Sequence, residues 1–364
     1  MSVAPIVFVN RAGRFSGAEV VLLKLVQAAC ARGENVRVVC PNGPLADRLP
    51  RSVEHFEIDE LDLGGSSGPA RLRAAGTLVR RWVRAAVVIR RAADTAGPII
   101  VNSLLALPAV RLARLPQRAS WLVHDTVHEA KQRAMIRIGK PAIRRAFAVS
   151  PPTAAPVRAL GLAVEVAPLG VDIPDTCATR GGRPPVVGIM ALLTPWKGHR
   201  VLLRALADVP GVHCEIAGTA IEADAEYAAE LRRLSETPEL SGRVRFLGHV
   251  DAVTTMATWD VLVNASTSPE ASPVSVLEAM SVGLPVIATD HGGSSWLLRD
   301  GAGMLVPVAD VAALAETVTW AVDNPESVTE MVDVARQRIA DVHDARTAYP
   351  AMLDALLDQA GDRL

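Results

Sequence analysis

Short apolar runs alternate with longer helix-forming segments along the chain, and this alternation limits the fold more than any other feature. In the first half, the strand-like runs are residues 6–10, 36–40, 99–102, 121–124 and 146–150. The segment 20–32 lies between the first two runs, has a helical pattern and ends before Gly33. A strand, a helix and a second strand in this order predict a parallel sheet with helices on its faces.

The second half repeats the alternation. Its strand-like runs are residues 186–190, 212–217, 244–247, 260–264 and 283–289. Residues 168–185, between the two series, are rich in Pro and Gly and have little periodicity. We therefore expect an α/β protein of two Rossmann-like, doubly wound domains that face each other across a cleft. The expected parts are a first domain at 1–168, a linker at 169–185, a second domain at 186–346, and a C-terminal helix at about 347–364 that packs back on the first domain.

Composition excludes several classes of protein. Half of the residues are apolar and only 21% are charged, which is typical of a globular chain. No apolar run approaches the roughly 20 residues that span a membrane, and no basic region or cleavage site precedes the first strand-like run, so we expect no signal peptide. Four scattered cysteines predict a reduced, cytoplasmic setting.

Charge is distributed unevenly between the two halves. Residues 1–170 carry 24 Lys and Arg against 12 Asp and Glu, whereas the remainder carries 14 against 27. A basic half predicts an anionic partner, and the low aromatic content of 4% argues against nucleic acid. Seven arginines lie in 70–92 and six basic residues in 131–145. We expect these two patches to contact an anionic membrane, at the inner face of the membrane; the alternative is two solvated helix faces.

A helix with an explicit start lies between the runs 260–264 and 283–289. Ser272 is a suitable N-cap residue, and Pro273 suits the first helical position. The backbone N–H groups of Val274 and Ser275 would then point out of the helix end, where the helix dipole favours an anion. This arrangement predicts a phosphate-binding site.

Two carboxylates frame this helix start. Glu270 precedes it, and Glu278 lies within the helix. Carboxylates accept hydrogen bonds from hydroxyl groups, so the stretch suits a sugar joined to a nucleotide diphosphate. The alternative is that both are ordinary solvated charges.

Six short motifs stand out along the chain. They are the glycine loop 16–19, the pair His124 and Asp125, the Lys-Gly element at 195–199, the strand-turn 246–250, the pair Glu270 and Glu278, and the segment 283–293. In kind and in order they resemble the motifs of the family 4 glycosyltransferases, and this resemblance implies the GT-B fold and retention of anomeric configuration. The most specific is the pair Glu270 and Glu278, which resembles the family's E-x7-E signature.

The resemblance implies a donor site for a nucleotide-diphosphate sugar, with UDP favoured over GDP. Lys197 would neutralise the charge on the leaving phosphate, and Glu270 would accept hydrogen bonds from the donor sugar. Glu278 would bind the ribose, and the backbone near Val250 would face the base. The remaining donor-binding candidates are Gly17, Ser272, Val274 and Ser275.

In the first domain, the resemblance places His124 beside the transferred sugar as a catalytic candidate with Lys197 and Glu270. Asp125 and Glu19 are expected on the acceptor side, although Glu19 also suits a purely structural charge at a helix start. The resemblance implies front-face attack, in which the leaving phosphate helps to deprotonate the hydroxyl acceptor. That acceptor is expected to be an intermediate of the cell envelope or of a polysaccharide, or a small metabolite.

We expect neither a metal ion nor another cofactor, because the chain has no Asp-x-Asp motif and no cluster of metal ligands. Lys197 and the helix end would supply the positive charge instead.

Three departures from the family pattern are visible, and the one at Leu192 leaves an alternative open. In the interdomain segment, Leu169 stands in place of the family's asparagine. Leu192 stands where an arginine is usual, and Arg11 or Arg14 is the candidate to replace that charge. Trp296 stands where the family often has an acid. The alternatives are a catalytically degenerate protein that binds a nucleotide sugar, and a nucleotide-sugar epimerase of the same fold.

Overall fold

The computed structural model describes residues 4–62, 69–94, 97–179 and 184–358, without the side chains of 69–72. The chain divides into two compact units. Unit 1 comprises Met1–Leu169 and Arg346–Leu364, and unit 2 comprises Gly170–Ala345.

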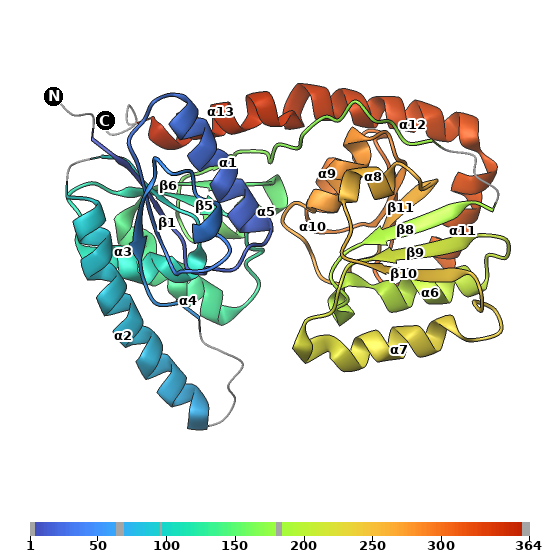
Figure 1. Ribbon diagram of the computed structural model, residues 1–364, viewed down its shortest axis with the longest axis horizontal. Helices are drawn as coiled ribbons and strands as arrows, with labels where there is room; N and C mark the ends of the chain where they lie inside the picture. Colours follow the sequence, from blue (N-terminus) through green and yellow to red (C-terminus); the bar gives the residue numbers. More distant parts are fainter. Residues whose placement is uncertain (1–3, 63–68, 95–96, 180–183, 359–364) are drawn as a thin grey trace. The chain divides into compact units, whose positions relative to one another are not determined.

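Unit 1 contains a parallel sheet whose described strands run in the order β3-β2-β1-β4-β5-β6-β7. The strands are β1 Ile6–Val9, β2 Val36–Cys40, β3 Glu54–Glu57, β4 Ile99–Val101, β5 Ala119–Val123, β6 Ile143–Ala148 and β7 Val164–Val166. The helices are α1 Gly17–Ala31, α2 Pro69–Ala92, α3 Leu107–Ala113, α4 Ala130–Gly139, α5 Pro151–Arg158 and α13 Ala345–Leu357, with short 3-10 turns at η1 Ala46–Arg48, η2 Leu104–Ala106 and η3 Lys140–Ala142. Helices α2, α3 and α4 lie on one side of this sheet, and α1 and α13 lie on the other (Figure 1).

Unit 2 contains a second parallel sheet, in the order β10-β9-β8-β11-β12-β13. The strands are β8 Val186–Met190, β9 His213–Ala217, β10 Val244–Gly248, β11 Val261–Asn264, β12 Val286–Thr289 and β13 Met304–Val306. The helices are α6 His199–Ala207, α7 Ala225–Ser235, α8 Ala252–Met256, α9 Val274–Ser281, α10 Gly292–Leu297, α11 Val311–Asp323 and α12 Pro325–Arg338, with short turns at η4 Pro195–Lys197, η5 Glu222–Asp224 and η6 Ile339–His343.

The expected α/β class with two doubly wound domains is therefore confirmed. In each sheet the strand order reverses at one point, between β1 and β4 in unit 1 and between β8 and β11 in unit 2. Ligands of such sheets bind outside the carboxyl ends of the strands at this switch point. The loops that follow β1, β4, β5, β8 and β11 are therefore the places to look for a site.

Three edge or near-edge strands, β3, β7 and β13, were not predicted. They have three or four residues each, and two of them, Glu54–Glu57 and Val164–Val166, contain acidic residues. A short run with polar residues has no clear strand signal in the sequence, and its pairing with an already formed sheet decides its conformation.

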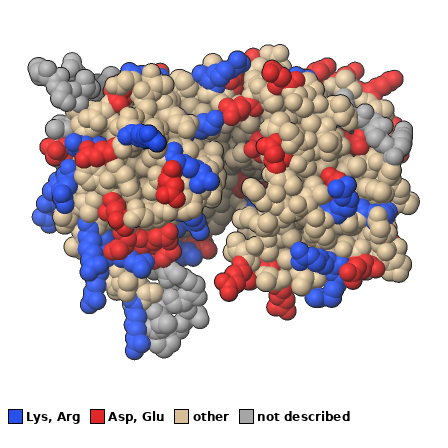
Figure 2. All heavy atoms as spheres, in the orientation of Figure 1, with Lys and Arg blue, Asp and Glu red and all other residues tan. Residues whose placement is uncertain are grey.

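The first of the two basic patches lies on α2, where basic side chains gather at the lower left of Figure 2. Leu78, Trp82 and Ile89 are buried against the sheet. A neighbouring face carries the exposed residues Val79, Val83 and Val87 between arginines. Among the described helices, none combines the length and hydropathy of a membrane-spanning segment.

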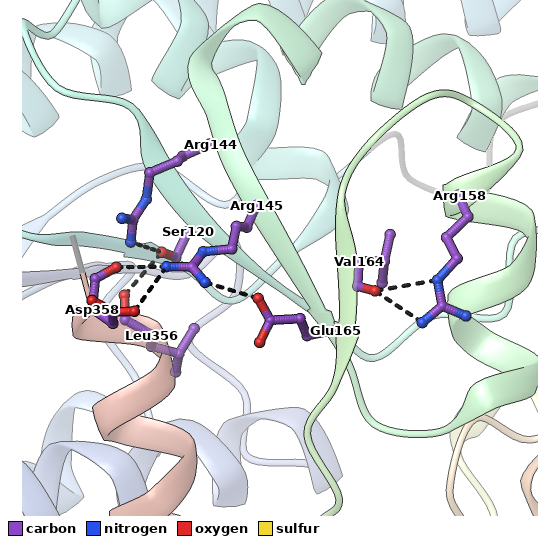
Figure 3. Close-up of polar contacts among 8 residues, drawn as sticks. All are labelled: Ser120, Arg144, Arg145, Arg158, Val164, Glu165, Leu356 and Asp358. Carbon is purple, nitrogen blue, oxygen red and sulfur yellow. Dashed lines mark hydrogen bonds and ion pairs between the residues drawn. The ribbon is translucent and has the colours of Figure 1, made fainter. Parts of the chain in front are cut away.

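The second patch is not one helix face, which corrects the interpretation of 131–145. Lys131 and Arg137 lie on α4, but Arg144 and Arg145 lie on β6. Arg145 donates to Glu165 at 2.8 Å and to the backbone oxygen of Asp358 at 2.7 Å (Figure 3). Arg144 and Arg145 therefore belong to a strand of the sheet and not to a helix. The contacts of Arg145 stabilise the fold, so the two residues do not continue an amphipathic helix face.

Residues 346–358 of the C-terminal segment lie against unit 1. The Ser120 hydroxyl, on β5, donates to the backbone oxygen of Leu356 at 2.9 Å (Figure 3). On α1, Arg32 pairs with Asp354 at 2.5 Å. These contacts join α13 to the sheet and to α1.

Candidate functional site

An ion pair stands directly before α9 in unit 2. The Lys197 ammonium lies 2.5 Å from Oε2 of Glu270, and both side chains are largely buried, at 16% and 11% exposure. Lys197 also lies over the Trp196 ring, 4.3 Å from its centroid, in a cation–π contact. The structure thus brings together two of the three residues expected to be catalytic.

The second oxygen of Glu270 is held by two further donors. Asn264 Nδ2 donates to Oε1 at 3.0 Å, and the Ser266 hydroxyl donates at 2.5 Å. Burial alone would raise the pKa of Glu270, but the Lys197 charge and the hydrogen bonds outweigh it, so the pKa lies below its ordinary value. Glu270 is therefore an ionised hydrogen-bond acceptor in a fixed position.

The start of α9 differs by one residue from the prediction. Pro273, not Ser272, is the N-cap, because its ψ of 114° is extended and its carbonyl accepts from Val276 and Leu277. The proline ring fixes φ at about −65°, a value that suits both the N-cap and the first helical position, so the sequence did not show which of the two Pro273 occupies. The Ser272 hydroxyl is buried, with no hydrogen-bond partner among the described residues. The backbone N–H groups of Val274 and Ser275 still belong to the first turn of α9, where they have no acceptor within the helix.

Glycines let the backbone pass close to this loop. A Cβ on Gly293 would lie 2.4 Å from the backbone oxygen of Ala271, and the Gly293 N–H donates to the Glu270 backbone oxygen at 2.7 Å. Gly198 has φ of 77°, and a Cβ there would lie 1.8 Å from the oxygen of Ala265. Larger residues at either position would displace the loop that carries Glu270.

Glu278 is the second carboxylate, on α9. Burial and, to a smaller extent, the charge of Asp251 raise its pKa to about 7. Asp251, which directly follows Val250, caps α8: its carboxylate accepts a hydrogen bond from the Thr254 N–H at 2.9 Å. In the described part of the chain, no hydrogen-bond donor serves the Glu278 carboxylate. The charge of Asp251, next to Val250, thus acts on Glu278, and the Glu278 carboxylate can accept hydrogen bonds from a ligand.

In unit 1, His124 follows β5 and is held by a polar network. Its Nε2 lies 2.8 Å from Oδ1 of Asn102. The Asn102 amide nitrogen donates to Asn10 Oδ1 and to the Ala18 backbone oxygen, both at 3.1 Å, which fixes the direction of this amide. His124 therefore carries its proton on Nε2, and burial lowers its pKa to about 4. The side chain is a neutral imidazole with Nδ1 available as an acceptor.

Glu19 is buried and has a structural role. It accepts from the Ser16 hydroxyl at 2.5 Å and from the Asn10 amide at 3.1 Å, in a capping box at the start of α1. These contacts suit the structural charge that the sequence offered as the alternative for Glu19, and its place on the acceptor side stays a prediction. Gly17, in the same turn, faces open space, since a Cβ there would meet no atom within 4 Å.

Asp125 lies on the wall of a cavity of about 580 Å³ in unit 1, with Arg11 and Arg14. The pKa of Asp125 lies above its ordinary value, mainly because surrounding protein atoms exclude water from the carboxyl group. The charge of Glu19 also raises this pKa, whereas the charges of Arg11 and Arg14 lower it. The other lining residues come mainly from α2, η2 and α4.

Leu192 and Trp296 mark two of the departures from the family pattern. Leu192 follows β8 and is 52% exposed, although it is apolar. Trp296, on α10, packs edge-on against His343 at 5.5 Å and lies under the Arg299 guanidinium. Its contacts are thus with the end of unit 2. Among the described residues, no group of three or more His, Cys, Asp or Glu is arranged to hold a metal ion.

Three asparagines of these networks were missed by the sequence analysis. Asn10, Asn102 and Asn264 each end an apolar strand-like run, at β1, β4 and β11. A signal was present, because an amide at the carboxyl end of a buried parallel strand lies at the switch point. Ser266 and Asp251 gave no comparable signal.

Comparison with protein families gives two matches that together cover most of the chain. The family described as "Glycosyltransferase Family 4" matches residues 15–174, and the family described as "Glycosyl transferases group 1" matches residues 179–338. The first match covers most of unit 1 and ends just inside unit 2, and the second match lies within unit 2.

Curated relatives share less of their length. LpsE of Rhizobium meliloti, a lipopolysaccharide core biosynthesis glycosyltransferase, is 29% identical over 174 residues, which are 47% of this chain and 49% of that protein. The D-inositol 3-phosphate glycosyltransferase of Mycolicibacterium smegmatis is 30% identical over 176 residues, 47% of this chain and 39% of that protein. The chain thus spans half or less of the length of these relatives.

Solved structures agree over nearly the whole chain. HepE of Anabaena, determined in complex with UDP and glucose, has a TM-score of 0.80 and 22% identity, and the match covers 96% of this chain and 98% of that one. At this level of identity, the likeness shows the shared GT-B fold.

Proposed function

Since the chain belongs to the family 4 glycosyltransferases, we propose that it transfers a sugar from a nucleotide-diphosphate sugar to a hydroxyl acceptor, with retention of configuration. The observation that carries the proposal is the buried pair of Lys197 and Glu270 at the start of α9, beside the unpartnered Ser272 hydroxyl. We favour UDP over GDP as the base, and the UDP bound to HepE supports this choice.

The donor side would work through charge and hydrogen bonding. The Lys197 ammonium has three N–H donors and uses one for Glu270, so the others are available to a phosphate oxygen. The N–H groups of Val274 and Ser275 and the dipole of α9 add to the positive potential. Together they would stabilise the charge that develops on the leaving diphosphate, without a divalent ion.

The two carboxylates would have different tasks. Glu270 is ionised and fixed, which suits an acceptor for the hydroxyl groups of the donor sugar. Glu278 has no donor among the described residues, and two ribose hydroxyls would provide donors. Val250 would contribute its backbone to recognition of the base.

In unit 1, the neutral His124 would accept a hydrogen bond at Nδ1 from a hydroxyl of the transferred sugar. Asp125 would orient the acceptor hydroxyl. In the front-face reaction, the acceptor oxygen forms the new bond to the anomeric carbon as the bond to the diphosphate breaks, and the hydroxyl proton passes to a diphosphate oxygen. This sequence requires no covalent intermediate on the protein.

For the acceptor, we propose an intermediate of the cell envelope, which the name of LpsE supports. The enzyme would work in the cytoplasm, at the inner face of the membrane. The support is α2, where Val79, Val83 and Val87 form an exposed apolar stripe between arginines, as in interfacial helices.

Vesicle binding tests the membrane contact. We expect the protein to co-sediment with phosphatidylglycerol vesicles at low salt and to be released at high salt, since the contact is partly electrostatic. Val83→Asp should reduce this binding, whereas Val334→Asp, an exposed valine of unit 2, is the matched control. Equal binding by both variants would contradict the assignment of α2.

One observation favours a second candidate, a degenerate protein that binds a nucleotide sugar without transferring it. Leu192 is exposed at a position where the family has a cation. If Arg11 or Arg14 does not replace that charge, the leaving diphosphate would lack one of its two cations.

A donor panel tests both candidates. Thermal shift with UDP- and GDP-sugars identifies the donor that stabilises the protein, because a ligand that binds only the folded state raises the melting temperature. Release of the nucleoside diphosphate from that donor is then measured in the presence of a membrane extract. Stabilisation without release would favour the degenerate protein, and neither effect with any donor would refute both.

A further inference from the structure

Much of the wall of the cavity in unit 1 is formed by apolar side chains. Leu78, Val79 and Trp82 of α2 face it together with Leu104 and Met135. Another lining residue, Leu105, accepts a hydrogen bond on its backbone oxygen from the Trp82 indole N–H at 2.8 Å. The only polar atom of the Trp82 ring is therefore satisfied, and the ring offers the cavity its carbon surface.

This surface does not suit a bare sugar. Hydroxyl groups placed against these side chains would give up hydrogen bonds to water without replacement. An apolar chain would instead gain free energy from each methylene that leaves water. The volume of about 580 Å³ lies within the usual range for small-molecule sites.

The charged residues of the same cavity favour an anion. Asp62 is paired with Arg81 at 3.6 Å, and Lys131 with Glu129 at 2.7 Å. Arg11 and Arg14 form no ion pair within the described part of the chain, and both charges act on the carboxyl of Asp125 on the same cavity wall. Two guanidinium groups thus stand against one carboxyl, and guanidinium groups bind phosphate well.

One residue connects the cavity to the outer surface. Val79 lines the cavity and is also 50% exposed, and it begins the stripe that continues at Val83 and Val87. An apolar chain longer than the cavity would therefore pass over apolar surface where it leaves.

We infer that this cavity binds an amphiphilic acceptor, which carries an apolar chain and an anionic group such as a phosphate. The chain would lie against α2, η2 and α4, and the anionic group against Arg11 and Arg14. This inference rests on the proposed glycosyltransferase function, because it names the class of acceptor for the same site.

Binding of hexyl, octyl and decyl phosphate, each below its critical micelle concentration, tests the inference by titration calorimetry of the full chain. We expect affinity to rise by about fourfold for each methylene that enters the cavity. Decyl phosphate should bind at least ~10-fold more tightly than both inorganic phosphate and decyl glucoside, which lack the chain and the charge respectively.

Two variants locate the site. Val79→Asp should weaken decyl phosphate at least ~10-fold, because it puts a charge at the entrance of an apolar cavity. Leu112→Asp is the matched control, since Leu112 is an exposed residue of α3 and is not among the lining residues. Affinity without dependence on chain length, or an equal effect of both variants, would overturn the inference.

UDP binding by the same preparations separates this inference from the proposed function. If UDP binds and decyl phosphate does not, the acceptor class is wrong and the donor site stands. If neither UDP nor GDP binds to the wild-type protein, the proposed function itself fails.

Discussion

If Glu278 binds the ribose, as we propose, its carboxyl group should make nucleotide binding depend on pH by an amount that can be calculated. In the free protein its pKa is raised to about 7, mainly by burial. A carboxylate that accepts both ribose hydroxyls must be ionised, so binding of UDP should release a proton below this pH. In the free protein, the raised pKa also means that stability falls as pH rises from the ordinary pKa of about 4.3 toward 7.

The size of the effect on affinity follows from linkage. If the pKa of Glu278 in the complex lies well below 6, the apparent dissociation constant scales with one plus the ratio of protonated to ionised carboxyl. For a pKa of 7, this factor falls from about 11 at pH 6 to about 1 at pH 8, so affinity for UDP should rise about tenfold. The phosphate group of UDP also titrates near pH 6 and contributes its own change.

Titration calorimetry of UDP from pH 6 to pH 8 measures this dependence, and Glu278→Gln separates the two contributions. The variant keeps the shape of the side chain but cannot ionise, so it retains only the change due to the phosphate. We expect the ratio of wild-type to variant affinity to rise about tenfold over this range. The same slope for both proteins would refute the assignment of Glu278 to the ribose.

Three further variants test other parts of the site. Asn102→Asp puts a carboxylate beside His124 and should raise the histidine pKa above its present value of about 4, as measured by NMR titration; an unchanged pKa would contradict the network. Lys197→Ala leaves Glu270 buried without its cation and should lower the free energy of unfolding, measured in urea, by about 3–5 kcal/mol. Adding Glu270→Gln to this variant should restore part of the lost stability, because it removes the unpaired charge. A second loss that adds to the first would contradict the ion pair. Gly293→Ala should cost about 1–3 kcal/mol and weaken UDP binding, because its Cβ would lie 2.4 Å from a backbone oxygen; a variant with unchanged stability and affinity would show that the loop tolerates the methyl group.

Much of the fold could be predicted because, in the buried elements, the pattern of apolar residues agrees with the positions of the glycines and prolines that bound them. The strands β1 and β8 contain only apolar residues and glycine, and β2 is interrupted only by Arg37; glycines or prolines bound the segments between the runs. The edge strands β3 and β13 could not be predicted, because pairing with a neighbour decides their conformation. The residues 131–145 were misinterpreted for the same reason: Arg144 and Arg145 have a helix-like charge pattern but lie on β6.

The site could be predicted where a residue type has a distinctive physical task. The E-x7-E spacing predicted two carboxylates at one helix start, and the structure places Glu270 before α9 and Glu278 within it. The partners of these residues were not visible in the sequence. Asn264 lies six residues from Glu270, but Lys197 lies 73 residues away, so only the fold brings that cation to the carboxylate. The pKa values of Glu278 and His124 likewise depend on burial by distant segments.

Transfer of a labelled sugar is the most direct test of the central claim. The donor selected by the thermal shift panel is supplied with its sugar labelled, and the products formed with a membrane extract are separated from free sugar. We predict a labelled, organic-soluble product whose new glycosidic bond has the anomeric configuration of the donor, formed together with the nucleoside diphosphate. A donor that binds but yields only free sugar, or a product with inverted configuration, would contradict the account.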